Sequence, residues 1–269
     1  MKIAILYICT GKYNQFFDGF YTSCEKYFLS GKAKKDYFVF TDYLAISNKP
    51  NVHITERKCQ GFPADSLFRF EYFLQVKDEI SKFDYIYFFN ANAEFKQPVG
   101  DELLPDETGL AMGLWYIMEK PWWNPWRVFD LPAFFSYERN RKSLAYIPPY
   151  GKDYKHFMGG LNGGRSQEYL KMIETLAHNI RDDYNRGVIA IAHDQSHINA
   201  YMRSHPCKII PREYCWPEEW PASFAPKIVF RDKKILGGEF LKGRQESRWG
   251  MVKRNFRRLK NAVRWYLYL

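Results

Sequence analysis

The sequence lacks the patterns that mark the commonest disulfide, metal and phosphate-binding sites. Its five cysteines are odd in number and show no Cys-x-x-Cys spacing, which argues against a disulfide framework or a zinc site and suits a reducing compartment. Neither G-x-G-x-x-G nor G-x-x-x-x-G-K-S/T occurs, so the standard dinucleotide and P-loop sites are not expected. No internal repeat or low-complexity segment is evident, which favours one continuous domain.

Long apolar runs are also missing. No stretch of about 18 apolar residues occurs, so we expect no membrane-spanning helix. The N-terminal run Ile3–Cys9 is too short for a signal peptide and has no cleavage pattern after it. These features predict a cytoplasmic protein.

The chain does contain a large apolar and aromatic fraction. Of its 269 residues 46% are hydrophobic, and they include 22 Phe, 20 Tyr and 8 Trp. A chain of this length buries a real core, as one large domain or two small ones. Aromatic side chains often line sites for nucleobases or sugars, although they also fill cores.

Positive charge is concentrated at the C-terminal end. From Lys242 to Leu269 there are nine Lys and Arg residues and one acid, Glu246, so this segment carries eight of the ten net positive charges. The rest of the chain is close to neutral, which argues against a protein coated by nucleic acid. The simplest division is a domain over residues 1–241 and a basic tail over residues 242–269.

Apolar patterns predict strands and helices that alternate along the first half of the chain. Such alternation is typical of an α/β protein with a mostly parallel sheet covered by helices. The expected strands are residues 3–9, 35–41, 51–54, 84–89 and 109–116, and the expected helices are residues 13–29, 66–83, 165–181 and 197–203. The proline-broken segment 120–133 is expected to be a loop.

The predicted strand that begins at Asp84 ends abruptly in Asn90-Ala91-Asn92. In open α/β sheets, ligands bind beyond the carboxyl ends of the strands. The two amides are therefore expected at the edge of a ligand crevice. An ordinary turn explains the same residues, because Asn tolerates turn conformations and bonds its own backbone.

Three further segments place polar or flexible residues near such an edge. Tyr7–Tyr13 ends the first strand, where a Rossmann-like half-sheet receives a nucleotide. Gly159–Gly164 has four glycines in six residues; its backbone can approach a ligand closely, and the expected helix after it would favour anions, whereas a flexible loop is the alternative. His193–His197 follows the apolar run 188–192 and reads as polar groups at a strand end, although Asp194 as a helix N-cap is the ordinary interpretation.

Together and in this order, the motifs resemble glycosyltransferase family 6, which includes the histo-blood-group A and B transferases and the α1,3-galactosyltransferase, and in particular its bacterial branch. The resemblance covers residues 1 to about 235 and rests on the segments 135–139 (FSYER), 145–148 (AYIP), 159–164 (GGLNGG), 193–199 (HDQSHIN) and 213–216 (EYCW). It implies a GT-A fold, in which a Rossmann-like nucleotide-sugar-binding sheet is joined to an acceptor-binding half. It also implies transfer of galactose or N-acetylgalactosamine from a UDP donor in α1,3 linkage to a β-galactoside, with retention of the anomeric configuration.

The resemblance implies a donor site and assigns residues to it. Arg69 matches a family arginine near the donor, where a guanidinium can meet a sugar hydroxyl or a neighbouring carboxylate. Gly160 leaves room for the larger acetamido group. The residues expected to contact uridine are Tyr7, Ile8, Cys9 and Tyr13; those expected to form the floor of the site are Asn90, Ala91 and Asn92; and those near the 2-position of the sugar are Met158, Gly159 and Gly160.

The resemblance also implies catalytic and acceptor residues. His193 and Asp194 would hold the sugar hydroxyls, and Gln195 lies where the family has a Glu beneath the anomeric carbon. Ser136, Trp216 and Glu218 are assigned to the acceptor, with Trp216 stacking on its galactose.

Two missing charges separate this sequence from the animal enzymes. Those enzymes have Asp-x-Asp where this chain has Asn90-Ala91-Asn92, and a hard dication such as Mn²⁺ requires the anionic ligands that amides do not supply. The bacterial branch carries Asn-x-Asn and works without metal, so we predict no metal and no cofactor. Arg231 and Lys233 would then meet the charge of the leaving UDP, although an exposed basic turn explains both equally well.

The second missing charge is at Gln195. An amide forms no normal glycosyl ester and offers only a carbonyl dipole. Either the chain is an engineered, weakened variant, or the enzyme naturally uses a front-face substitution with Gln195 as an electrostatic aid. A catalytically weak or inactive relative that binds UDP-sugars or glycans is the alternative function.

The tail predicts an amphipathic helix. Val252, Phe256, Leu259, Val263 and Tyr266 fall on one helical face, and basic residues occupy most of the rest. This pattern is typical of a helix that lies on an anionic bilayer, which would suit an acceptor carried on a lipid at the cytoplasmic leaflet. Docking of the helix on its own domain or on a partner is the alternative, and no nucleic-acid-binding motif surrounds it.

Overall fold

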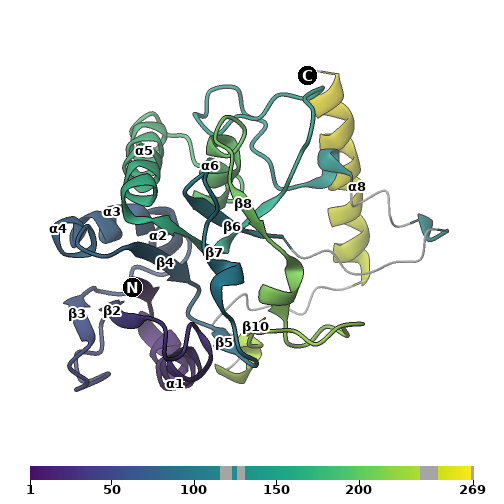
Figure 1. Ribbon diagram of the computed structural model, residues 1–269. Coiled ribbons are helices and arrows are strands. Elements are labelled where there is room, and N and C mark those ends of the chain that lie inside the picture. Colours follow the sequence, from purple (N-terminus) through teal and green to yellow (C-terminus); the bar gives the residue numbers. More distant parts are fainter. Residues whose placement is uncertain (116–122, 126–130, 237–247, 268–269) are drawn as a thin grey trace.

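The structure is a computed structural model that describes residues 1–115, 123–125, 131–236 and 248–267 (Figure 1). Its strands are β1 (Lys2–Ile8), β2 (Lys34–Thr41), β3 (Val52–Glu56), β4 (Tyr85–Phe89), β5 (Ala93–Phe95), β6 (Leu110–Leu114), β7 (Phe157–Arg165), β8 (Lys208–Ile210), β9 (Trp216–Pro217) and β10 (Ile228–Phe230). Its α-helices are α1 (Phe17–Tyr27), α2 (Ala64–Leu67), α3 (Arg69–Leu74), α4 (Lys77–Ile80), α5 (Ser166–Asn185), α6 (Asp194–Tyr201) and α8 (Arg248–Tyr266). Short 3-10 helices are η1 (Gly11–Phe16), η2 (Asp101–Leu103), η4 (Pro132–Phe134), η5 (Arg212–Tyr214) and η6 (Lys233–Leu236).

Seven strands form the central sheet in the order β3-β2-β1-β4-β7-β6-β8, and β5-β10-β9 form a smaller sheet. The first four strands are parallel, whereas β7 runs antiparallel to both β4 and β6. The predicted α/β architecture is confirmed, and its sheet and helices are consistent with a GT-A-like fold. The carboxyl ends of β1, β2 and β4 share one edge of the sheet, which is the edge where the predicted site residues gather.

Alternating side chains of the buried strands build a core on each face of the sheet. Ile3, Ile5 and Tyr7 of β1 pack with α1, whereas Ala4 and Leu6 pack with α3 and α5. This division follows from the two-residue repeat of a strand. Figure 1 shows α1 on the opposite side of the sheet from α3 and α5.

The helix predicted over residues 66–83 is three short helices. The backbone leaves helical geometry at Phe68 (φ −97°, ψ 15°) and again at Val76 (φ −112°, ψ 22°). Apolar residues keep helical spacing across both breaks, so the sequence pattern does not reveal them. The helix predicted from residue 13 likewise begins as the 3-10 turn η1.

The alternative of a flexible loop over Gly159–Gly164 is wrong, because these residues lie inside β7 in the middle of the sheet. A Cβ on Gly163 would lie 2.3 Å from Cδ1 of Tyr87, and one on Gly164 would lie 2.5 Å from the Gly109 carbonyl oxygen. These glycines therefore make room for the neighbouring strands. Since β7 is antiparallel to β4, α5 begins at the far edge of the sheet, and its N-terminus cannot serve an anion at the ligand edge.

Helix α8 packs against the body of the protein through one face. Ala262 and Trp265 are buried, and the indole Nε1 of Trp265 donates to the Ile147 carbonyl oxygen at 2.9 Å. No helix within the described ranges is long and apolar enough to cross a membrane. The predicted domain boundary at residues 241 and 242, and most of the predicted loop 120–133, lie outside the described residues.

Candidate active site

The Asn90-Ala91-Asn92 segment is held in place at the carboxyl end of β4. The Asn90 amide Nδ2 donates to Asn92 Oδ1 at 2.9 Å, and Asn92 Nδ2 donates to the Arg231 carbonyl oxygen at 2.7 Å. The Tyr7 hydroxyl donates to the Ala91 carbonyl oxygen at 2.7 Å. Both Asn side chains are therefore part of a hydrogen-bonded edge and not of a loose turn.

The residues at the end of β1 are mostly structural. Tyr7 and Cys9 are fully buried in the core next to α1, and burial raises the pKa of both groups. Their side chains are therefore not available to uridine, so the contacts expected at Tyr7 and Cys9 stay a prediction for their backbone atoms. Ile8 faces the other way and is half-buried, as the strand alternation requires.

Tyr13 and Lys233 are brought together as the resemblance implied for two donor-site residues. The Lys233 ammonium lies 5.3 Å from the centre of the Tyr13 ring, within the range of a cation–π contact. Two carboxylates that the sequence reasoning missed stand beside them: Asp42 accepts from the Gly11 N–H at 2.9 Å, and Asp65 accepts from the Thr10 hydroxyl at 3.1 Å. Asp42 directly follows β2. The strand-end argument that was applied to Asn90 would therefore have identified Asp42 too.

A buried ion pair joins three elements at the centre of the site. Arg69, at the start of α3, lies 2.9 Å from Asp194, at the start of α6, and its Nη1 donates to the Gly159 carbonyl oxygen of β7 at 2.7 Å. Burial raises the pKa of Asp194 to about 6, against the opposing effect of Arg69. The neighbouring-carboxylate role implied for Arg69 matches this geometry, and the expected N-cap role of Asp194 does not, because His193 holds that position with φ 53°.

His193 occupies a strained turn and not the end of a strand. The run 188–192 forms no strand, and Ile189 and Ile191 are exposed. The left-handed φ of His193 is unfavourable for a residue with a Cβ. Its ring meets the Phe62 ring edge-on at 4.8 Å.

Gln195 is fixed at both ends of its amide. The Gly159 N–H, which can only donate, is 3.2 Å from Gln195 Oε1. Gln195 Nε2 then faces His156 Nε2 at 3.2 Å and Ser136 Oγ at 3.4 Å. Ser136, predicted on the acceptor side, therefore lies beside Gln195, predicted as catalytic.

His156 is a site residue that the sequence reasoning missed. Its ring stacks on Phe135 at 4.9 Å and lies against Trp115 and Tyr137. Burial lowers the pKa of His156 to about 3, so the ring is neutral and Nε2 can accept a hydrogen bond. The only sequence signal was a lone histidine just before β7, which matches no spacing rule.

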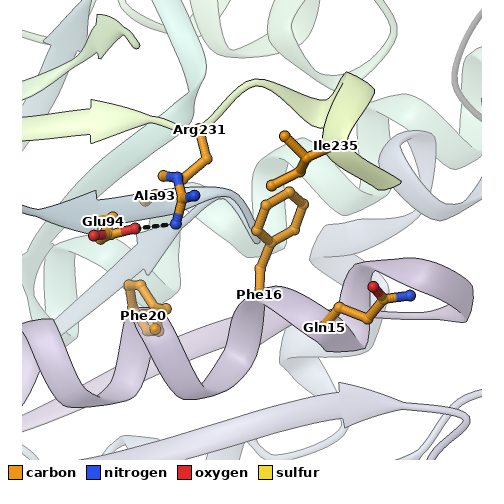
Figure 2. Close-up of a pocket in the computed structure, with 8 residues that line it drawn as sticks. Gln15, Phe16, Phe20, Ala93, Glu94, Arg231 and Ile235 are labelled. Atoms are coloured by element: carbon orange, nitrogen blue, oxygen red, sulfur yellow. Dashed lines mark hydrogen bonds and ion pairs between the residues drawn. The ribbon is translucent and has the colours of Figure 1, made fainter. Parts of the chain in front are cut away.

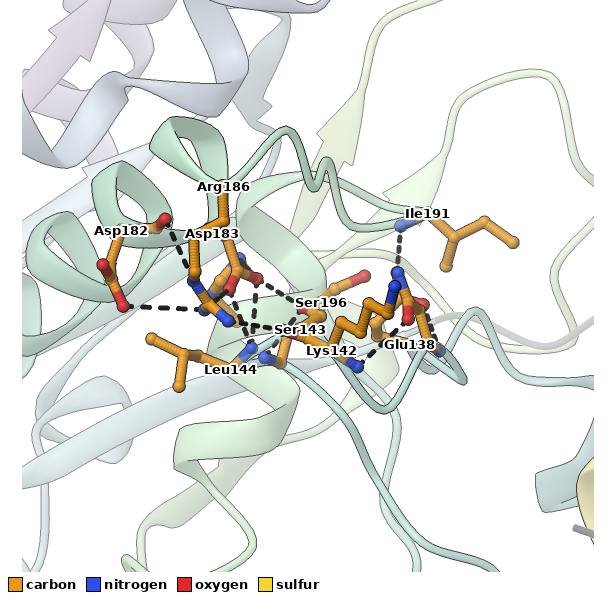
Figure 3. Close-up of polar contacts among 12 residues, drawn as sticks. Glu138, Lys142, Ser143, Leu144, Asp182, Asp183, Arg186, Ile191 and Ser196 are labelled. Carbon is orange, nitrogen blue, oxygen red and sulfur yellow. Dashed lines mark hydrogen bonds and ion pairs between the residues drawn. The ribbon is translucent and has the colours of Figure 1, made fainter.

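Two buried carboxylates lock the segment 135–148 against α5 and α6 (Figure 3). Glu138 accepts from the Ile191 N–H at 2.6 Å and from the Asn140 N–H at 2.7 Å. Asp183 accepts from the Leu144 N–H at 2.9 Å and also binds the Ser143 hydroxyl and the Arg186 guanidinium. This network holds Ser136 near Gln195, which explains why the motifs around residues 138 and 194 belong to one site.

Arg231 is next to the site but its charge is already paired. Its guanidinium binds Glu94 and, at 3.1 Å, Glu218. Figure 2 shows the Arg231 side chain bound to Glu94, and both residues line a cavity of about 240 Å³ beside α1. Arg231 is therefore not an unpaired cation placed to bind a diphosphate. Glu218 is bound to Arg231 and is not open to an acceptor.

Trp216 is a core residue in this structure. Its side chain is 1% exposed, and the rings of Trp220 and Phe224 meet it edge-on at 6.0 and 5.0 Å. The expected stacking surface for an acceptor sugar is therefore covered. Aromatic type alone does not separate a sugar platform from a core residue.

Gly159 and Gly160 line the centre of the site from β7. A Cβ on Gly159 would lie 3.0 Å from Asp194 Oδ2, and one on Gly160 would lie 3.4 Å from both the Asn90 Cβ and the Phe230 ring. Met158 is buried beside them. Asn90, Gly160, Asp194 and Gln195 thus converge on one place, as the resemblance implied.

The seven-stranded α/β sheet, with polar residues gathered at one edge, is the arrangement expected of a GT-A-like glycosyltransferase. The chain belongs to glycosyltransferase family 6, whose sequence model matches residues 1–234. Membership implies a nucleotide-sugar donor and a glycan acceptor.

Curated relatives come from bacteria and animals. The chain is 32% identical over 236 residues to the O-antigen biosynthesis glycosyltransferase WbnI of Escherichia coli, and the alignment covers 87% of this chain and 96% of that protein. It is 27% identical over 233 residues to the rat histo-blood group ABO system transferase 2, with 82% and 66% covered. It is 24% identical over 241 residues to the dog globoside alpha-1,3-N-acetylgalactosaminyltransferase 1, with 85% and 65% covered.

The Asp194 carboxylate predicts how transfer activity depends on pH. Its raised pKa of about 6 means that Asp194 becomes protonated, and loses its charge interaction with Arg69, as the pH falls through this value. His156 and His197 have pKa values lowered to about 3 and 4 by burial and stay neutral there. We expect kcat/KM to fall on the acid side with an apparent pKa near 6, and UDP-sugar binding by Asp194→Asn to lack this step. A flat profile from about pH 5 to 8 would contradict it.

Proposed function

We propose that the protein is a retaining transferase that moves galactose or N-acetylgalactosamine from UDP to the 3-hydroxyl of a β-galactoside, without a metal ion. The observation that carries the proposal is the convergence of Asn90, Gly160, Asp194 and Gln195 at one edge of the sheet. Support for the sugars and the linkage comes from relatives whose names specify alpha-1,3 transfer of N-acetylgalactosamine or galactose. A role in glycan biosynthesis, such as that of the O-antigen, agrees with the bacterial relative.

The packing around Gly160 bears on the donor sugar. Even one added carbon at this position would meet Asn90 and Phe230 at 3.4 Å, so any side chain there would take space from the site. The resemblance places the 2-position of the donor at this residue, so we propose that the bare glycine admits N-acetylgalactosamine as well as galactose.

The Asn90 and Asn92 side chains do not fit a metal site. Both side chains are neutral. Asn90 Nδ2 donates a hydrogen bond to Asn92 Oδ1, and Asn92 Nδ2 donates to the Arg231 carbonyl oxygen. A hard dication prefers anionic oxygens, and paired amides supply none. Lys233, over the Tyr13 ring, is the cation we assign to the charge of the leaving UDP.

A donor screen in chelator tests both the sugar and the metal. UDP-sugars are offered with a panel of β-galactosides, in EDTA and in Mn²⁺. We expect transfer from UDP-galactose-type donors that changes by less than about twofold between EDTA and Mn²⁺, because no step depends on a metal Lewis acid. Loss of activity in EDTA that Mn²⁺ restores would overturn metal independence.

Gln195 favours one alternative function, a relative that binds UDP-sugars or glycans without transfer. A neutral amide cannot act as the nucleophile of a double displacement. Binding of UDP-sugar by calorimetry, with no UDP released in the presence of a β-galactoside, would support this alternative and overturn the transferase.

We also propose peripheral membrane association through α8. The five apolar residues predicted on one face are all exposed, from 38% at Tyr266, whose ring contacts Tyr150, to 71% at Phe256. The helix docks through Trp265 and Ala262 instead, so docking and membrane binding use different faces. Basic residues beside the apolar face suit an anionic leaflet.

Vesicle co-sedimentation tests the role of the exposed face. Phe256→Gln should weaken binding to anionic vesicles by roughly tenfold, because it removes an aromatic ring whose burial in lipid is worth about 1.5–3 kcal/mol. Phe62→Gln is the matched control, since Phe62 is equally exposed at 71% and lies elsewhere. Equal binding by the two variants would remove the membrane proposal.

A further inference from the structure

A second cavity lies where α8 meets the body, outside the transfer site. Its volume is about 190 Å³, enough for a phosphate group. One wall is the segment 137–146 and the other is the C-terminal half of α8. The lining residues that matter here are Glu138, Arg139, Arg141, Ile191, Arg264 and Trp265.

Three guanidiniums line this cavity against one carboxylate. That carboxylate, Glu138, is already bound by three backbone N–H groups, from Arg139, Asn140 and Ile191. Burial imposes a cost on the charge of Arg139, which lowers its pKa against the opposing effect of Glu138. An anion in the cavity would relieve that cost, and guanidiniums suit phosphate oxygens in geometry as well as charge.

The basic stripe of α8 separates the cavity from the exposed apolar stripe of the helix. At about 100° per residue, the exposed apolar positions form one stripe along the helix, and Lys253, Arg257, Lys260 and Arg264 form the next. Arg264 belongs to this basic stripe and also lines the cavity. A lipid headgroup that binds the basic stripe would therefore meet Arg264, which also lines the cavity.

We propose that this cavity, the arginine pocket, binds the phosphate of an anionic phospholipid headgroup. The site is separate from the donor edge, yet Ile191 and Glu138 in its wall are each two residues from a side of the transfer site, His193 and Ser136. An occupied pocket would hold the acceptor side of the enzyme against the leaflet. Phosphate binding in this pocket is a separate property from the overall positive charge of α8 and from the transfer reaction.

Two double variants with the same charge change test the pocket. Arg141→Gln/Arg264→Gln removes two exposed lining charges, and Arg257→Gln/Lys260→Gln removes two charges from the same helix outside the lining. The probe is monomeric dihexanoyl phosphatidylglycerol, titrated by calorimetry against the full chain. We expect at least about tenfold weaker binding by the pocket variant, as for lost charge-assisted hydrogen bonds, and little change in the control.

Three outcomes would overturn the proposal. Equal losses in both double variants would mean diffuse attraction to positive charge, and no loss in either would mean binding elsewhere. Binding of inorganic phosphate as tightly as the lipid would show a free-anion site and not a headgroup site. Circular dichroism of both variants checks the fold, which the exposed positions of all four side chains should leave unchanged.

Discussion

Replacement of Arg69 by Met should destabilise the protein by about 3–5 kcal/mol at neutral pH and abolish measurable transfer, because it leaves Asp194 buried without its cation. Arg69 and Asp194 are 8% and 3% exposed and lie 2.9 Å apart. The loss should shrink as the pH falls below the raised pKa of Asp194, since protonation then removes the unpaired charge. Urea unfolding at neutral and at acid pH measures the difference in the free energy of unfolding between the variant and the unchanged protein.

Arg181→Met provides the control for this experiment. Arg181 also pairs with a carboxylate, Glu71, but the two side chains are 44% and 30% exposed. Solvent-exposed pairs contribute about 0–1 kcal/mol, so this variant should unfold near the unchanged protein. Similar losses for the two arginines would show that burial of the Arg69–Asp194 pair has no special role.

Gln195→Ala should lower kcat by roughly 10²-fold with little change in the KM of the donor, as expected for loss of a dipole that acts on the transition state. Gln195→Glu should bring no gain at neutral pH. The amide is already satisfied by the Gly159 N–H and by the neutral His156, whereas a carboxylate would add a second negative charge next to the buried Asp194.

Turnover of the Gln195 variants decides between the two interpretations of this residue. No gain with Glu supports an enzyme that naturally works with an amide here. A gain of several orders of magnitude would identify Gln195 as the cause of a weakened site. Gln195→Ala with unchanged kcat would remove the residue from the mechanism altogether.

Sequence patterns predicted best what depends on short-range periodicity and strand ends. β1, β2 and β4 formed as expected, and the strand-end rule placed Asn90 and Asn92 at the sheet edge where the other predicted site residues also lie. The same rule extends to Asp42, which it was not used to find. Family motifs then located Arg69, Ser136, Asp194 and Gln195, which the structure brings together.

The failures share a physical cause, since each depends on a contact in the folded chain that no sequence pattern specifies. Gly163 reads as a flexible residue until the Tyr87 ring of the adjacent strand is known. Trp216 reads as a sugar platform until Trp220 and Phe224 are seen to cover it. His156 has no motif at all, and its role comes only from the distances to Ser136 and Gln195.

The bond between Trp265 and Ile147 changes what the end of the chain means for handling this protein. A shortened form that stops before α8 would lose more than a helix with exposed apolar side chains. It would expose Tyr137 and Tyr154, whose rings pack on Trp265 at 6.3 and 5.7 Å. The hydrophobic core would then be open to solvent one residue from Ser136. Expression work should therefore keep the helix and replace its exposed apolar side chains by polar ones.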